Sequence, residues 1–76
     1  MLSQDKKSRI RIVLVNTSHP GNIGAAARVM KNMALTDLYL VSPKIFPSAE
    51  ATAMAAGADD LLSRANVVEE LSDALQ

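Results

Sequence analysis

The stretch Val13-Leu14-Val15-Asn16-Thr17-Ser18-His19-Pro20-Gly21-Asn22-Ile23-Gly24-Ala25-Ala26-Ala27-Arg28 decides the fold of this 76-residue chain. It opens within the continuous apolar run Ile12–Val15, which predicts a parallel strand buried on both faces. Pro20 and Gly21 then indicate a turn, and Asn22 has the side chain of a helix N-cap. The stretch therefore predicts a strand, a polar loop and a helix from about Ile23 to Met33.

The start of this helix is a candidate site for an anionic group. Its first-turn N–H groups and the positive end of its dipole face the loop, at the end of a strand where open α/β sheets bind ligands. Gly24 and Arg28 share one helix face, so the guanidinium is expected to lie over the bare glycine and reach the helix start. The alternative is an ordinary solvated surface arginine. The loop has neither a P-loop Lys-Ser/Thr nor a complete dinucleotide fingerprint.

The remaining pattern predicts one α/β unit with a Rossmann-like, mainly parallel sheet and flanking helices. Residues 1–8 are expected to be a flexible N-terminus, and residues 9–76 form the structural unit. The expected elements after the first strand, Ile10–Val15, and the first helix are a strand at Asp37–Val41, a helix at Ala49–Ala56, a strand at Val67–Val68 and a helix at Ser72–Gln76. We expect the first strand to lie between the other two.

Several details of the alanine-rich helix can be predicted from the sequence. Ser48 is expected to cap its start, and Gly57 is expected to follow its last turn in the left-handed conformation. Alanines allow close packing against a neighbouring sheet or helix. Ala49, Ala53 and Ala56 are therefore expected to be packing residues without a functional role.

The composition is that of an ordinary globular domain, with 49% hydrophobic and 21% charged residues. The chain contains no cysteine, which excludes disulfides, cysteine nucleophiles and thiolate metal sites. No long apolar run predicts a membrane span, and the first residues do not resemble a signal peptide. We expect a cytoplasmic protein without a bound metal.

The net charge is zero, but the charges are unevenly distributed. The first 31 residues are basic, and the segment from Asp59 is acidic. The basic residues are Lys6, Lys7, Arg9, Arg11, Arg28 and Lys31; the acidic ones are Asp59, Asp60, Glu69, Glu70 and Asp73. This asymmetry would let the half that contains the motif face phosphate groups, and a solvated surface without a partner explains it almost as well.

The segment Ile12–Met33 resembles the first motif of the SPOUT superfamily of RNA 2′-O-ribose methyltransferases. The similarity is greatest to bacterial members that methylate the pyrimidine at position 32 of the tRNA anticodon loop. It continues through Leu38–Val41, Pro43, Ala55–Ala58 and Val67–Leu75, and so covers nearly the whole chain. Asn22 and Arg28 match the asparagine and arginine that define the motif. The family usually has glycine where this chain has Ala34, so either the helix cap differs or the helix ends elsewhere.

The resemblance implies a function for each part of the motif. Arg28 and Asn22 would be the catalytic residues of a tRNA 2′-O-methyltransferase. A guanidinium stays protonated, so Arg28 would stabilise the developing alkoxide or hold a neighbouring phosphate, and Asn22 would shape the loop. The expected RNA contacts are Asn16, Thr17, Ser18, His19, Gly24, Arg28 and Lys31. His19 could serve as a general base, but a turn residue before Pro20 is the simpler interpretation.

The resemblance also implies what this chain lacks. Members of the superfamily bind S-adenosylmethionine in a C-terminal trefoil knot, and no matching motifs follow in this sequence. We therefore expect the chain to be the N-terminal portion of the methyltransferase domain with the knot absent, inactive by itself and without cofactor-binding residues. The complete enzyme is expected to bind tRNA and to form a homodimer. Two alternatives are a non-catalytic RNA- or nucleotide-binding α/β half-domain and a purely structural piece.

Overall fold

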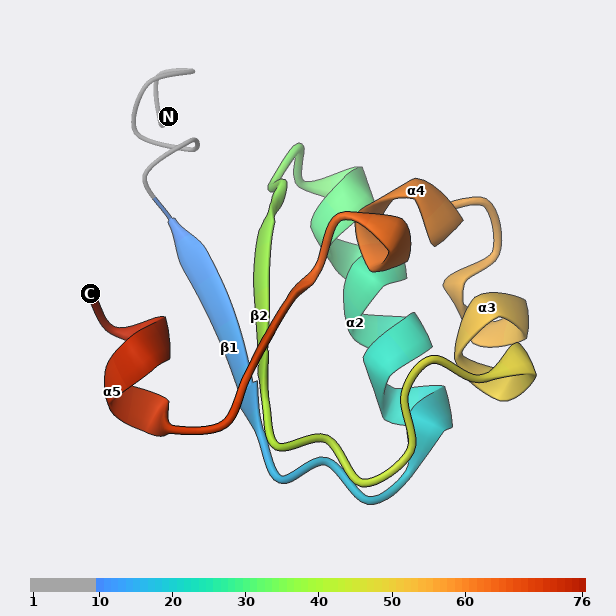
Figure 1. Cartoon of the computed structure of the whole chain (residues 1–76). Helices are drawn as coiled ribbons and strands as arrows, with labels where there is room; N and C mark the ends of the chain where they lie inside the picture. Colours follow the sequence, from blue (N-terminus) through green and yellow to red (C-terminus); the bar gives the residue numbers. More distant parts are fainter. Residues whose placement is uncertain (1–9) are drawn as a thin grey trace.

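The computed structural model describes residues 10–76, so the predicted flexible N-terminus at residues 1–8 lies outside the described residues. Its sheet is parallel and has three strands, β1 (Arg11–Val15), β2 (Asp37–Val41) and β3 (Asn66–Val68). Helices α2 (Pro20–Asn32), α3 (Ala49–Ala55) and α4 (Asp59–Ser63) lie on one side of the sheet, and the short helix α5 (Leu71–Ala74) lies on the other (Figure 1). The predicted α/β class with a parallel sheet and flanking helices is confirmed.

The strand order is β1-β2-β3, so β2 is the central strand and β1 lies at an edge. The prediction that the first strand lies between the other two is therefore wrong. An apolar run such as Ile12–Val15 reports that both faces of a strand are covered, and it does not report whether both edges are paired. Strand β1 departs from this pattern: its side chains are at most half-buried and Val15 is 48% exposed, so the predicted burial on both faces is also wrong. Among the described residues, β1 pairs only with β2.

The core lies between the sheet and the three helices on its first side. Side chains from β2 alternate in the sense expected for a strand, with Leu38 and Leu40 buried on the helix side and Tyr39 half-buried on the other. The helices contribute buried aliphatic side chains from each element. These are Ile23, Ala27 and Met30 from α2, Ala51 and Ala55 from α3, and Leu61 and Leu62 from α4.

Helix α2 begins at Pro20, three residues before the predicted start. The predicted N-cap Asn22 lies inside the first turn, where its N–H donates to the His19 carbonyl at 3.0 Å. His19 is the N-cap residue and forms no side-chain capping bond. Proline suits the first helical position because its φ is already helical and its missing N–H would have no intrahelical partner.

The C-terminal cap of α2 is present although its left-handed residue is alanine. Ala34 has φ 59°, its N–H donates to the Lys31 carbonyl, and Leu35 N–H donates to the Met30 carbonyl at 2.9 Å. These two bonds are those of a Schellman motif, and Leu35 and Met30 are both buried in the core. The expectation that the cap differs or that the helix ends elsewhere is wrong, because the alanine adopts the conformation that glycine would favour.

Helix α3 follows the predicted boundaries closely but packs through other alanines. The Ser48 side-chain oxygen accepts the Ala51 N–H at 3.1 Å, as predicted, and Gly57 has a positive φ of 96°. The buried residues are Ala51 and Ala55, one helical turn apart, and the predicted packing set of Ala49, Ala53 and Ala56 is exposed. The face of α3 is set by its contact with α2, which the alanine pattern alone cannot indicate.

Gly24 is the point of closest approach between α2 and α3. A Cβ atom built at Gly24 would lie far inside the van der Waals contact distance from the Ala51 carbonyl oxygen and 2.9 Å from Ala55 N. Only a hydrogen fits in this space, so the α3 backbone lies directly on the α2 surface. The predicted bare surface over which Arg28 would lie does not exist, because α3 covers it.

We expect Gly24→Ala to lower the free energy of unfolding by about 1 to 3 kcal/mol, since the clash is with backbone and the helices must separate. The measurement is urea unfolding followed by circular dichroism. Gly21→Ala, earlier in the same helix, is the matched control because its Cβ would meet only side chains, the movable end of Glu50 at 3.0 Å and Met54 at an ordinary contact distance of 3.6 Å. Equal stability of the Gly24→Ala and wild-type proteins would contradict the assigned packing.

We expect Ala34→Gly to raise the free energy of unfolding by about 0.5 to 1 kcal/mol. Glycine removes the steric cost of the left-handed conformation, which is about 1 to 2 kcal/mol for alanine. The greater conformational freedom of glycine in the unfolded chain offsets part of this gain. The same unfolding assay applies. Ala26→Gly within α2 is the control and should destabilise by about 1 kcal/mol; a loss of stability in Ala34→Gly would show that the cap is not strained.

Candidate functional site

The carboxyl ends of the three strands lie at the same end of the sheet, where backbone hydrogen bonds connect the residues that follow β1 and β2 to the neighbouring strands. Asn16 N–H donates to the Val41 carbonyl and Ser42 N–H donates to the Val68 carbonyl, each at 2.8 Å. Asn16 and Ser42, the first residues after β1 and β2, both have left-handed φ angles, 52° and 45°. The chain therefore turns away from the sheet at the same level after β1 and after β2, which places the two following loops side by side.

The loop after β1 contains four of the predicted site residues. Asn16, Ser18 and His19 are exposed, and Thr17 is half-buried. The Thr17 carbonyl accepts the Lys44 N–H from the loop after β2 at 3.1 Å. The predicted RNA-contact residues 16–19 are thus brought together on a surface loop, and the loop after β2, which contains none of the predicted site residues, lies against them.

Asn22 and Arg28 both lie on α2 with exposed side chains. Among the described residues, neither side chain forms a hydrogen bond or an ion pair. Six residues of helix separate their Cα atoms by about 9 Å along the axis. Arg28 is therefore available to a ligand, and its guanidinium is not held by an internal carboxylate of the described chain.

Two predicted contact residues have structural partners that place them away from the loop. Gly24 is buried beneath α3. Lys31, near the other end of α2, donates from Nζ to the Gly57 carbonyl at 2.9 Å and to Asp60 Oδ1 at 3.3 Å. The hydrogen bond from Lys31 lowers the pKa of Asp60. The structure therefore does not bring Gly24 or Lys31 together with residues 16–19.

The N-terminal end of α2 already has an acidic neighbour. Helix α2 has no acidic residue in its own first turn, but a Glu50 carboxylate oxygen from α3 lies 3.0 Å from the Cβ position of Gly21. A negative charge at this position interacts favourably with the helix dipole. The binding half-domain considered above would use this helix end as an anion cradle, and Glu50 disfavours that function.

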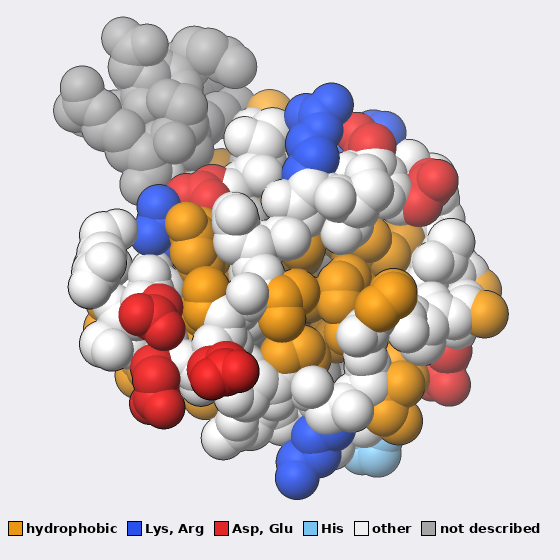
Figure 2. All heavy atoms as spheres, in the orientation of Figure 1, with side chains coloured by type: hydrophobic (Ala, Val, Ile, Leu, Met, Phe, Trp, Pro, Cys, Tyr) orange, Lys and Arg blue, Asp and Glu red, His pale blue; other side chains and the backbone are white. Residues whose placement is uncertain are grey.

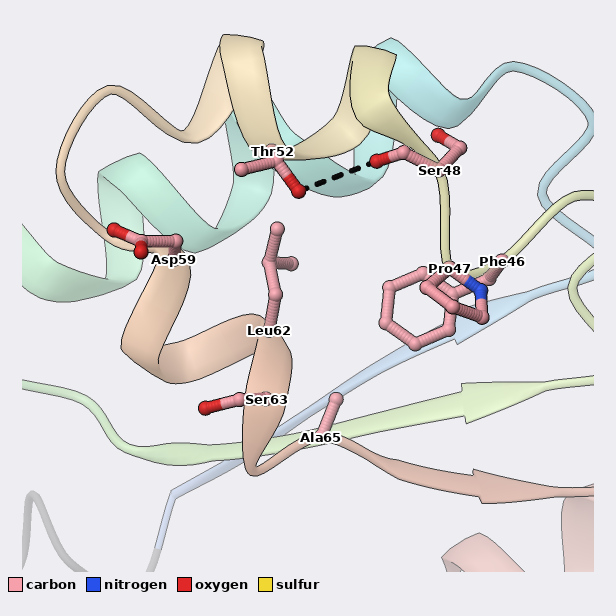
Figure 3. Close-up of a pocket in the computed structure, with 8 residues that line it drawn as sticks. All are labelled: Phe46, Pro47, Ser48, Thr52, Asp59, Leu62, Ser63 and Ala65. Atoms are coloured by element: carbon pink, nitrogen blue, oxygen red, sulfur yellow. Dashed lines mark hydrogen bonds between the residues drawn. The ribbon is translucent and has the colours of Figure 1, made fainter.

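A separate open pocket of about 450 Å³ lies between the loop after β2 and helices α3 and α4. Figure 3 shows Phe46, Leu62 and Ala65 lining it, together with the hydroxyls of Ser48, Thr52 and Ser63. These hydroxyls bond to local backbone: Ser48 accepts from Ala51 N–H, Thr52 donates to the Ser48 carbonyl and Ser63 donates to the Asp60 carbonyl. The pocket shares no residue with the predicted site, and its three hydroxyls form hydrogen bonds within the ends of α3 and α4.

Two further observations concern membrane spans and metal ligands. No helix in the structure of residues 10–76 combines the length and the apolar character that a bilayer span needs. Within the same residues, no three His, Cys, Asp or Glu side chains are grouped as metal ligands would be.

Together these features define an α/β domain in which the first strand leads through an exposed loop into a helix with an exposed asparagine and arginine. The model of the SpoU rRNA Methylase family matches residues 9–76, and the chain belongs to this family. The chain is 63% identical over 67 residues to the tRNA (cytidine/uridine/adenosine-2'-O-)-methyltransferase TrmJ of Pseudomonas aeruginosa, which covers 88% of this chain and 26% of that protein. It is 56% identical to the tRNA (cytidine/uridine-2'-O-)-methyltransferase TrmJ of Citrobacter koseri over 87% of this chain and 27% of that protein.

Solved structures give the same result for the fold. A probable methylase family protein from Haemophilus influenzae Rd KW20 superposes with a TM-score of 0.88 at 49% identity, over 91% of this chain and 29% of that chain. TrmJ from Z. mobilis ZM4 superposes with a TM-score of 0.81 at 42% identity, over 84% of this chain and 29% of that chain. The chain thus spans about a quarter of the length of the curated relatives it matches.

Proposed function

We propose that this chain is the N-terminal part of a tRNA 2′-O-methyltransferase that modifies the pyrimidine at position 32 of the anticodon loop. The observation that supports this most directly is the exposed Arg28 without an internal partner in the described chain, on the helix that follows the β1 loop. The two TrmJ relatives named above, at 63% and 56% identity, support the same reaction class.

When bound, S-adenosylmethionine would supply the methyl group for the ribose 2′-oxygen and would leave as the thioether S-adenosylhomocysteine. The hydroxyl proton would pass to water. Arg28 cannot accept this proton because a guanidinium remains charged. Its role is to stabilise negative charge on the 2′-oxygen as that charge develops, or to hold the adjacent phosphate through its planar donors.

The other predicted site residues have supporting roles in this proposal. Asn22 lies in the first turn of α2 and would orient the loop that receives the ribose. Residues Asn16 to His19 would contact the RNA from the loop after β1, where three of the four are exposed. His19 acts as the helix N-cap, which favours the turn interpretation over that of a general base.

The absence of cofactor-binding residues from this part of the protein stays a prediction of the same proposal. The pocket between the loop after β2 and helices α3 and α4 is lined equally by apolar and polar residues, and its three hydroxyls bond to backbone groups. We therefore assign cofactor binding to the part of the protein that corresponds to the other three quarters of the relatives. The homodimer and the cytoplasmic location stay predictions of the same proposal.

In a full-length protein that contains this chain, we expect Arg28→Ala to lower methyl transfer by about 10² or more. Loss of one donor to a developing oxyanion typically costs about 2.7 to 4 kcal/mol of transition-state stabilisation. Arg28→Lys should rescue little, because lysine keeps the charge and loses the planar fork. The assay follows tritiated methyl transfer to unmodified tRNA at saturating cofactor, with cofactor affinity measured by calorimetry and expected to stay unchanged.

The matched control is Arg64→Ala, which removes another exposed arginine at the end of α4 and should leave turnover unchanged. Removal of a donor to the oxyanion should lower turnover at least about tenfold. If Arg28→Ala retains more than about a third of wild-type turnover, Arg28 is therefore an ordinary surface residue.

A further inference from the structure

Lys44 is the basic residue that the fold brings to the proposed RNA-binding loop. It lies three residues after β2, and its N–H donates to the Thr17 carbonyl at 3.1 Å. Its side chain is exposed, and neither ion pair of the described residues involves it. Figure 2 shows Lys or Arg and His side chains at the lower end of the molecule, where Figure 1 places the loops after β1 and β2.

The two flanks of this loop pair are acidic. On one flank, the Glu50 carboxylate lies beside Gly21 at the start of α2. On the other, the Ser42 hydroxyl donates to the Glu69 carbonyl at 2.8 Å, which holds the acidic Glu69-Glu70 segment against the end of β2. Acidic side chains also gather over α5 and the segment before it (Figure 2). An RNA phosphate would be repelled at either flank and attracted between them.

We propose that Lys44 contacts a backbone phosphate of the bound RNA, so that the RNA strand crosses the loops after β1 and β2 between Glu50 and Glu69. This inference rests on the proposed function and adds a contact to it. A lysine suits the task because a compact ammonium on a flexible stem neutralises one phosphate without reading a base. Lys44 is a binding residue here and takes no part in methyl transfer itself.

The test measures tRNA affinity of the full-length protein by fluorescence anisotropy over a series of salt concentrations. Lys44→Ala should weaken binding about three- to tenfold at low salt and lower the slope of log affinity against log salt by roughly 0.7 to 0.9, the value for one lost phosphate contact. Lys44→Arg should restore both. The KM for tRNA should rise with the loss of affinity, and cofactor affinity should stay at its wild-type value.

Arg64→Ala is the matched control, because Arg64 is an exposed basic residue at the end of α4, before the amino end of β3 and so away from the loops. It should leave the salt slope unchanged. An unchanged slope in Lys44→Ala, with wild-type protein that binds and methylates tRNA, would overturn the Lys44 contact and leave the proposed function intact. A wild-type protein that binds no tRNA at all would overturn both.

Discussion

The direct contact of α3 with α2 at Gly24 is the constraint on which the rest of the structure depends. Because only hydrogen fits between Gly24 and the Ala51 carbonyl, α3 lies close enough for Ala51 and Ala55 to be fully buried. Helix α4 then adds Leu61 and Leu62 to the same core, and the chain returns to the free side of β2 as β3. A side chain at position 24 would displace α3, and with it the segment that brings β3 to the sheet.

The sequence predicted the elements whose signals are local. The strand at Asp37–Val41, the Ser48 cap and the positive φ of Gly57 follow from side-chain alternation, a capping hydroxyl and a flexible glycine, and the structure confirms all three. Helix α4 was missed because its five residues are too few for a periodic pattern. The edge position of β1 was missed for a different reason, since strand pairing depends on where distant segments return.

The residues of the candidate site also divide into those that a local sequence signal identifies and those that only the fold brings together. Arg28 and Asn22 could be chosen from the sequence because both belong to a recognisable motif, and the structure leaves both exposed. The role of Gly24 could not be predicted, since its burial depends on a helix that begins 25 residues later. Lys44 and Glu50 are close to the motif only in space, so no spacing in the sequence relates them to it. The sequence thus indicates the candidate residues, and the fold adds the charged side chains around them.

Arg11 joins the first strand to the last helix of the described chain. Its Nε donates to Asp37 Oδ2 at 2.8 Å, its Nη1 donates to the Ala74 and Gln76 carbonyls at 2.9 Å, and its guanidinium lies 4.1 Å from the Tyr39 ring centre. The hydrogen bond with Asp37 also raises the pKa of Arg11, which keeps the guanidinium charged. One side chain thus forms hydrogen bonds with acceptors on β2 and at the end of α5, which are far apart in the sequence. The edge strand and α5 are therefore expected to open as one cooperative unit in native-state hydrogen exchange, so that fraying at one end of the domain is transmitted to the other.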